Sequence, residues 1–287
     1  MKTNIACIPC FIRQITEVVS IASKDKNTQL RLLKNSLAFL SGLSLYELKP
    51  PQVAKLIHNF IKNETGISDL YKDIKARSNK FARSLFKEME DLVKKSQVPF
   101  ETSLRLAIAG NIIDYGQAKD VNDDTIKKSI EDSLNAKLDL KTIEKLYKDL
   151  QNAKNILYLG DNAGEIYFDK LFISQIPNKS IIFAVRGKPI INDITIEDAI
   201  EAEIHRLCDI IDTGDATPGI ILEDCSDNFI KIFSKADIII SKGQGNFETL
   251  FDVKDKKIYF LLKIKCDPVA DIVGYKLGET AIICNKE

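Results

Sequence analysis

The pattern of apolar residues changes near Asn155, and this change restricts the possible folds more than any other feature of the chain. Beyond it, short apolar runs alternate with helical segments. We expect strands at 155–159, 180–185, 209–212, 236–240, 258–262 and 280–284. Strands that alternate with helices are joined by right-handed crossovers and form a mainly parallel sheet. The second half of the chain is therefore predicted to be an open α/β sheet.

The first half of the chain is predicted to be helical. Apolar residues recur at spacings of three and four in the segments 11–23, 27–41, 50–62, 67–97 and 99–113. The sequence shows no internal repeat and no low-complexity linker between the halves. We therefore expect a helical region at residues 1–150 that packs against an α/β core at residues 151–287.

Composition excludes several classes of protein. A chain of 287 residues with 45% hydrophobic content can bury a proper core. Its 41 basic and 41 acidic residues balance, so no global field draws it to nucleic acid or to an anionic membrane. The N-terminus lacks the apolar core of a signal peptide, and we see no apolar run of membrane-spanning length. We predict a cytoplasmic protein with reduced thiols, whose oligomeric state the sequence leaves open.

A small polar turn follows the first expected strand. Asp161 and Asn162 come directly after Gly160, at the edge where open α/β sheets bind ligands. Carboxylate and amide oxygens suit magnesium or manganese, and with only His58 and His205 in the chain a catalytic histidine cluster is not expected. The turn alone is equally compatible with a cap of the following helix.

A second acidic turn follows the next expected strand, 180–185, and begins at Arg186. Asp193 stands shortly before a helix that opens at Thr195. Ordinary helix capping accounts for Glu197 and Asp198 in the first turn. It accounts less well for another acid at the edge where Asp161 stands, so we favour Asp193 as a third metal ligand, with Asp198 as the alternative.

A glycine-rich loop follows the expected strand 236–240. Lys242 precedes a run whose glycines let backbone amides turn toward an anion. The lysine comes before the glycines, so the loop is not a Walker A motif, and by itself it is equally well an ordinary turn. Combined with the acidic turns it predicts a site for phosphate and metal. The expected substrate-binding residues here are Arg186, Gly243, Gln244, Gly245 and Asn246.

Two further motifs carry polar groups in the helical half. Asn111 and Asp114 lie one turn apart in an apolar segment, where they either line a cleft shared with the sheet or bond to loop backbone; we favour the cleft. Cys7 and Cys10 form a single Cys-x-x-Cys, which fits a redox pair, half of a zinc site or a detail of a helix start.

Taken in order, these motifs resemble one known family over nearly the whole chain. The chain resembles the metal-dependent damage-control phosphatases, long classed as a domain of unknown function and also described as protein-glutamate carboxyl methyltransferase-like. The N-terminal cysteine pair is similar to the microbial subfamily. The motifs lie at residues 7–14, 110–116, 160–165, 192–195, 241–248 and 262–266.

The resemblance implies a Rossmann-like three-layer core with a helical region, and hydrolysis of phosphate monoesters of small metabolites such as sugar phosphates or phosphopantetheine derivatives. The implied cofactor is a divalent ion: manganese, cobalt, nickel or magnesium. By motif matching, Asp161, Asn162 and Asp193 would hold the metal, and Lys242 would bind phosphate. Asn111 and Asp114 would face the substrate.

Two other functions remain open. An S-adenosylmethionine-dependent methyltransferase would need a glycine-rich turn at Gly160 to Gly164, but Asp161 stands where the chain should approach the cofactor. The sequence hardly distinguishes a phosphatase from a protein that binds a phosphometabolite without turnover. We favour hydrolysis by a metal-activated water, with Lys242 offsetting charge on the phosphoryl group.

Overall fold

The computed structural model describes residues 1–110, 131–176 and 180–286. In these residues a six-stranded sheet has the order β3-β2-β1-β4-β5-β6, in which β6 is antiparallel to β5 and the other pairs are parallel. This order confirms the predicted Rossmann-like, mainly parallel core. The strands are β1 (Asn155–Leu159), β2 (Ser180–Val185), β3 (Asp209–Asp212), β4 (Ile238–Lys242), β5 (Ile258–Lys263) and β6 (Thr280–Cys284).

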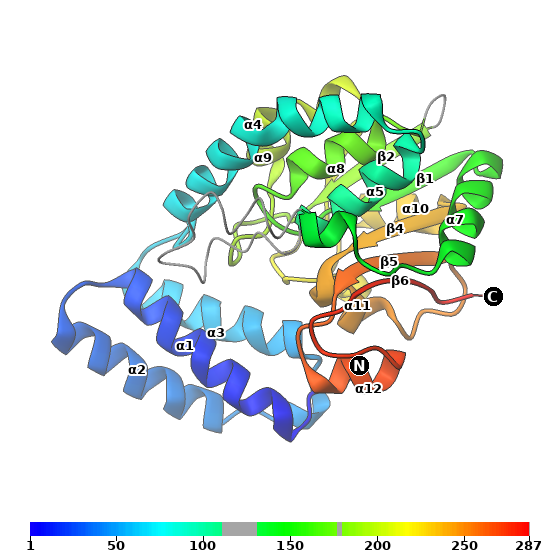
Figure 1. Cartoon of the computed structure of the whole chain (residues 1–287). Coiled ribbons are helices and arrows are strands. Elements are labelled where there is room, and N and C mark those ends of the chain that lie inside the picture. Colours follow the sequence, from blue (N-terminus) through cyan, green and yellow to red (C-terminus); the bar gives the residue numbers. More distant parts are fainter. Residues whose placement is uncertain (111–130, 177–179, 287) are drawn as a thin grey trace.

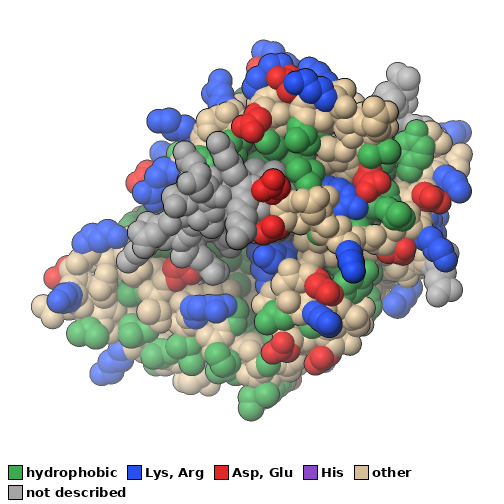
Figure 2. Space-filling view, in the orientation of Figure 1, with side chains coloured by type: hydrophobic (Ala, Val, Ile, Leu, Met, Phe, Trp, Pro, Cys, Tyr) green, Lys and Arg blue, Asp and Glu red, His purple; other side chains and the backbone are tan. Residues whose placement is uncertain are grey.

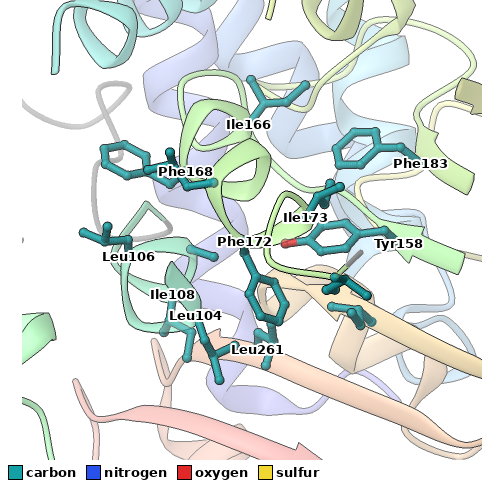
Figure 3. Packing of buried hydrophobic residues seen from close by; sticks show 14 of the residues in the cluster. Leu104, Leu106, Ile108, Tyr158, Ile166, Phe168, Phe172, Ile173, Phe183 and Leu261 are labelled. Atoms are coloured by element: carbon teal, nitrogen blue, oxygen red, sulfur yellow. The ribbon is translucent and has the colours of Figure 1, made fainter. Parts of the chain in front are cut away.

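Helices cover both faces of the sheet and give three layers (Figure 1). One face carries α5 (Pro99–Gly110), α7 (Leu140–Asn152) and α8 (Ile166–Ile173), with α4 (Lys72–Lys95) packed on α5 and α8 and with α9 (Ile196–Glu201) beside them. The other face carries α10 (Asp227–Lys235), α11 (Gly243–Leu250) and α12 (Asp267–Val273). Figure 3 shows Phe172 of α8 packed close to Tyr158 of β1.

The remaining helices form a separate lobe. Helices α1 (Ile8–Ala22), α2 (Lys26–Ser41) and α3 (Pro50–Thr65) share a core of their own around Phe11, Ile15 and Ile57, which extends to Tyr71. Short 3-10 turns lie at Ile5–Cys7, Leu45–Glu47, Ile204–Arg206 and Leu222–Asp224. The helical region predicted at 1–150 thus divides between two cores, because α4, α5 and α7 bury their apolar faces with the sheet.

Lysines of α3 and its N-cap tie this lobe to loops at the edge of the sheet. Lys49 Nζ donates to the Thr249 carbonyl at 2.6 Å. Lys55 Nζ pairs with Asp215 at 2.5 Å and with Asp224 at 3.0 Å, and Lys62 donates to the Pro189 carbonyl. These contacts orient α3 along the carboxyl ends of the strands, so the lobe forms one wall of any site there.

Most expected boundaries agree with the structure, and the differences have physical causes. Strand β4 was expected at 236–240 but continues to Lys242, because Ser241 and Lys242 pair with Phe260 and Leu261 of β5. The helix α7, which the sequence analysis did not single out, follows from Ile143, Leu146 and Leu150 at helical spacing.

One segment, Ile5–Ala22, is long and apolar enough to cross a membrane by length and composition alone. The sequence analysis expected no apolar run of this length, and Arg13 and Glu17 do interrupt the run. Its side chains Phe11 and Ile15 are buried in the helical lobe, as in an amphipathic core helix.

Figure 2 shows acidic and basic side chains interspersed on one face of the molecule, in keeping with the balanced charge.

Candidate active site

The candidate site lies at the switch point of the sheet, where β1 and β4 are neighbours and the strand order reverses. The turn after β1 carries Asp161, and α11 begins directly after β4 at Gly243. Gly243 has φ of +77°, and a Cβ at this position would overlap the Asp161 carboxylate. Only glycine permits this approach of the two strand ends. Ligands bind at such crevices in open α/β sheets.

The two acidic turns pair with each other through their backbones. An isolated antiparallel bridge joins Asn162 to Asp193. Ala163 N–H donates to the Asn192 carbonyl at 2.8 Å, and Ile194 N–H donates to the Asp161 carbonyl at 2.9 Å. The pairing fixes the turn after β1 against the loop after β2, and so brings together the three predicted metal ligands.

Arg186, at the end of β2, lies behind the two aspartates. Its Nε donates to Asp193 Oδ2 at 2.6 Å, and one terminal nitrogen donates to Asn246 Oδ1 at 3.0 Å and lies 3.8 Å from Asp161 Oδ1. We call Arg186, Asp193, Asp161 and Asn246 the Arg186 cluster. Asn246 in turn donates to the Lys242 carbonyl at 2.8 Å, so its side chain links the ends of β2 and β4.

The Arg186 cluster has more negative than positive charge. Burial, together with the charges of Glu165 and Asp193, raises the pKa of Asp161 to about 8, although Arg186 and Lys265 oppose the rise. Burial also raises the pKa of Asp193 against the effect of Arg186. A bound divalent cation would supply the missing positive charge, so the oxygen donors present fit a hard metal ion.

Lys242 occupies a different environment. Its Nζ pairs with Glu165, with Asp169 Oδ1 at 2.5 Å and with the Ala107 carbonyl at 2.8 Å, and the side chain is fully buried. Tyr158 donates its hydroxyl to the same Asp169 oxygen at 2.7 Å. We call Lys242, Glu165, Asp169 and Tyr158 the Lys242 cluster. Because β4 continues to residue 242, strand alternation directs this lysine to the face covered by α5 and α8.

Helix α4 supports both acidic turns from outside. Asn79 Oδ1 accepts from Gly164 N–H at 2.7 Å, and its Nδ2 donates to Asp198 Oδ1 at 2.9 Å. Lys75 Nζ lies 2.6 Å from Asp198 Oδ2, which also accepts from Thr195 N–H at 2.8 Å as a helix cap. Asp198 is thus engaged by a cap, an amide and a lysine, which favours Asp193 over Asp198 as the third ligand.

A cleft of about 480 Å³ separates the helical lobe from this edge of the sheet. On the sheet side it is lined by Asp161, Asn162, Asp193, Gln244 and Gly245, and by Lys265 from the segment after β5. The predicted site residues thus divide. Arg186, Lys242, Gly243 and Asn246 lie behind the cleft wall, and Asn111 and Asp114 lie outside the described residues.

Comparisons with known proteins identify the family of the chain. Residues 3–281 match the family of the damage-control phosphatase ARMT1-like domain. The chain belongs to this family. It is 34% identical to damage-control phosphatase PH1575 of Pyrococcus horikoshii, over 99% of this chain and 98% of that protein. The protein MJ0202 of Methanocaldococcus jannaschii is 36% identical over 99% of this chain and 95% of its own length.

The fold is also that of a solved family structure. The crystal structure of the DUF89 family protein PH1575 from Pyrococcus horikoshii matches with a TM-score of 0.90 and 33% identity, over 100% of both chains. This match confirms the predicted architecture of a mostly parallel sheet with an N-terminal helical region.

Sequence reasoning missed three charged residues of this family member. Glu165 and Asp169 are spaced i and i+4 on a helix whose other residues are largely apolar, and two buried acids on one face of such a helix require a cation. That spacing could have indicated a partner for Lys242. Lys265, which follows β5 and lines the cleft, was not assigned to the site either.

The cysteine pair also lies in the cleft. Cys7, Cys10 and Cys266 all line it, and Gln244 Nε2 donates to Cys266 Sγ at 3.3 Å. Burial raises the pKa of the Cys7 and Cys266 thiols. Within the described part of the chain, no three His, Cys, Asp or Glu side chains are grouped in a way that could hold a metal ion.

Proposed function

We propose that the protein is a divalent-metal-dependent phosphatase that hydrolyses phosphate monoesters of small metabolites. The observation that carries this proposal is the pair of buried carboxylates, Asp161 and Asp193, held side by side at the switch point with too little positive charge around them. The name of the relative PH1575, a damage-control phosphatase, supports the same reaction.

Asp161, Asn162 and Asp193 would hold the ion, which would be manganese, cobalt, nickel or magnesium. Asn162 Nδ2 donates to Asp161 Oδ2 at 2.8 Å, so its amide would turn over to offer oxygen instead, and the two amide orientations have nearly the same shape. When bound, such an ion lowers the pKa of a water and polarises a phosphoryl oxygen.

The chain itself supplies orientation and charge. Arg186 fixes the Asp193 carboxylate through a short hydrogen bond. The Lys242 ammonium is saturated by Glu165 and Asp169, so its predicted contact with phosphate would require that ion pair to open. Lys265 is exposed, lines the cleft and lies near enough to Asp161 to affect its pKa. We therefore favour Lys265 as the cation that meets the phosphate.

The size of the cleft suits a small metabolite. A volume of about 480 Å³ falls within the usual range of small-molecule sites, about 300–1,000 Å³. Sugar phosphates and phosphopantetheine-like compounds are of this size. Such substrates are consistent with action in the cytoplasm, where we propose that the protein works.

Phosphate release from a panel of monoesters tests the proposal. The protein should be inactive in EDTA and active after addition of at least one of manganese, cobalt, nickel or magnesium, and Asp161→Asn should lack this activity. A parallel assay for methyl transfer from S-adenosylmethionine tests the alternative enzyme. Metal-dependent binding of an ester without phosphate release would identify a sensor, and methyl transfer without phosphate release would identify a methyltransferase.

A further inference from the structure

The wall of the cleft opposite the aspartates contains buried polar atoms that the proposed hydrolysis does not use. His58 of α3 is 1% exposed and lines the cleft, and its Nδ1 has no hydrogen-bond partner among the described residues. Gln14 of α1 lines the same cleft, and its buried Oε1 also has no partner there. Buried polar atoms are rarely left unpaired, because each has lost its hydrogen bonds to water without a replacement.

The described residues around these two atoms do not provide the missing hydrogen-bond partners. The Gln14 amide nitrogen is directed at Cys10 Sγ, 3.9 Å away, which leaves the oxygen on the other side. The ring of His58 lies 5.8 Å, centroid to centroid, from that of Tyr71. Pro50 and Ala54 add apolar surface to the same cleft. The wall therefore combines apolar patches with two unpaired polar atoms, as small-molecule sites do.

The chemistry of the two atoms indicates what they bind. Gln14 Oε1 only accepts hydrogen bonds, so it repels an anion and needs a donor. Burial, with a further contribution from the charge of Lys62, lowers the pKa of His58 to about 3, so the imidazole is neutral at pH 7. A neutral imidazole nitrogen either donates or accepts. A hydroxyl group does both, and it suits both atoms whichever tautomer is present.

We propose that Gln14 and His58 form a subsite in the helical lobe that binds the hydroxylated, uncharged leaving group of the phosphate ester. The phosphate would lie at the sheet edge near Asp161, and the alcohol portion would extend across the cleft to α1 and α3. The subsite rests on the proposed phosphatase function. It gives the helical lobe a part in choosing the substrate.

Two esters of equal chain length test the subsite: a hexose 6-phosphate and n-hexyl phosphate, which has no hydroxyls. The variants are Gln14→Leu and His58→Leu, with His58→Gln to retain hydrogen bonding. Ser36→Ala is the matched control, because Ser36 is a buried hydroxyl of the same lobe, also without a partner among the described residues, that does not line the cleft.

The wild-type protein should prefer the hexose ester by at least about tenfold in kcat/KM, since a site built to bind hydroxyls discriminates against an analogue that lacks them. Each leucine variant should lower this preference roughly tenfold by slowing the hexose ester alone. His58→Gln should retain part of it, and Ser36→Ala should retain all of it. Equal losses for both esters, or an unchanged preference, would overturn the subsite.

Failure of the phosphatase proposal would look different. If the wild-type protein hydrolyses neither ester with any of the four metals, the proposed function is wrong. Calorimetric titration of the same two esters into the same variants then tests the subsite without turnover. Tighter binding of the hexose ester that is lost in both leucine variants would support it, and equal binding of the two esters would overturn it.

Discussion

Arg186 and Lys242 are both buried and each lies near two carboxylates, but the two cations differ in how closely they contact these acids. In the Lys242 cluster the ammonium contacts both acids and a carbonyl, and the group is sealed beneath α5 and α8. In the Arg186 cluster the guanidinium contacts Asp193 closely but lies 3.8 Å from Asp161, and both aspartates line the cleft.

The pKa shifts of the charged groups also distinguish the two clusters. Burial would lower the pKa of Lys242, but Asp169 and Glu165 outweigh it and the net pKa is raised. Burial raises the pKa of Asp169 to about 6, with Lys242 opposing, whereas Asp161 rises to about 8. Removal of the cation from a saturated buried ion pair is costly, whereas added positive charge would favour the ionised form of acids whose pKa is raised.

The largest expected effect is on catalysis, from Asp161→Ala in the Arg186 cluster. Loss of a metal ligand should lower metal-stimulated phosphate release by about 10⁴-fold, roughly 5 kcal/mol. The free energy of unfolding should stay equal or rise, because a buried acid facing Glu165 and Asp193 is removed. Urea denaturation and metal titration measure the two quantities. Full activity at limiting metal would remove Asp161 from the ligand set.

Substitution of Lys242 should instead lower the stability of the protein. Lys242→Met leaves Glu165 and Asp169 without their cation and should lower the free energy of unfolding by about 3–5 kcal/mol. The neighbouring Ser241→Ala is the control, since Ser241 is equally buried but lies outside the cluster, and it should cost less than about 1 kcal/mol. A stable Lys242→Met protein that had lost only phosphate binding would restore the role predicted from sequence.

Glu248, a buried acid outside both clusters, extends the comparison to pH. Glu248 accepts from the Gln244 amide at 2.8 Å, and burial raises its pKa to about 7. The folded state therefore binds this proton more tightly than the unfolded state, so stability falls as pH rises from about 4.5 to about 7. Glu248→Gln should remove up to about 3 kcal/mol of that fall, measured by urea denaturation across this range. An identical pH profile in the variant would show that Glu248 ionises normally.

The smallest effect should come from substitution of Lys265, which is exposed in the cleft. Lys265→Met should weaken inorganic phosphate binding and kcat/KM roughly tenfold, as expected for one charge-assisted hydrogen bond. Its effect on unfolding should be within about 0.5 kcal/mol, because the side chain is exposed. Lys263→Met is the control, because Lys263 is the last residue of β5, two positions earlier, and does not line the cleft. Equal effects of the two variants would mean a general charge effect.

Much of the site was predictable because its residues are local signals. Asp161 and Asn162 follow an apolar strand, Asp193 precedes a capped helix, and the order of strands and helices requires a parallel sheet with these turns at one edge. These features depend on nearest neighbours along the chain, which the sequence displays directly. The family resemblance rests on the same local motifs.

The contacts of Lys242 depend on tertiary structure. Its direction depends on how far β4 continues, which is set by pairing with Phe260 and Leu261 of another strand. Two added residues of pairing direct the lysine toward Glu165 and Asp169 instead of leaving it in the loop. Strand length and register are long-range properties, so a local pattern could place the lysine at the sheet edge but not choose its partners.

The sequence by itself determined the α/β core, its helical region and the acidic turns at the carboxyl ends of the strands, because periodicity and turn residues act over short distances. Only the tertiary structure decided that Asn162 pairs with Asp193, and that Gln14 and His58 line the cleft opposite them. Those contacts join residues far apart in the chain, and they form only after separate elements have packed.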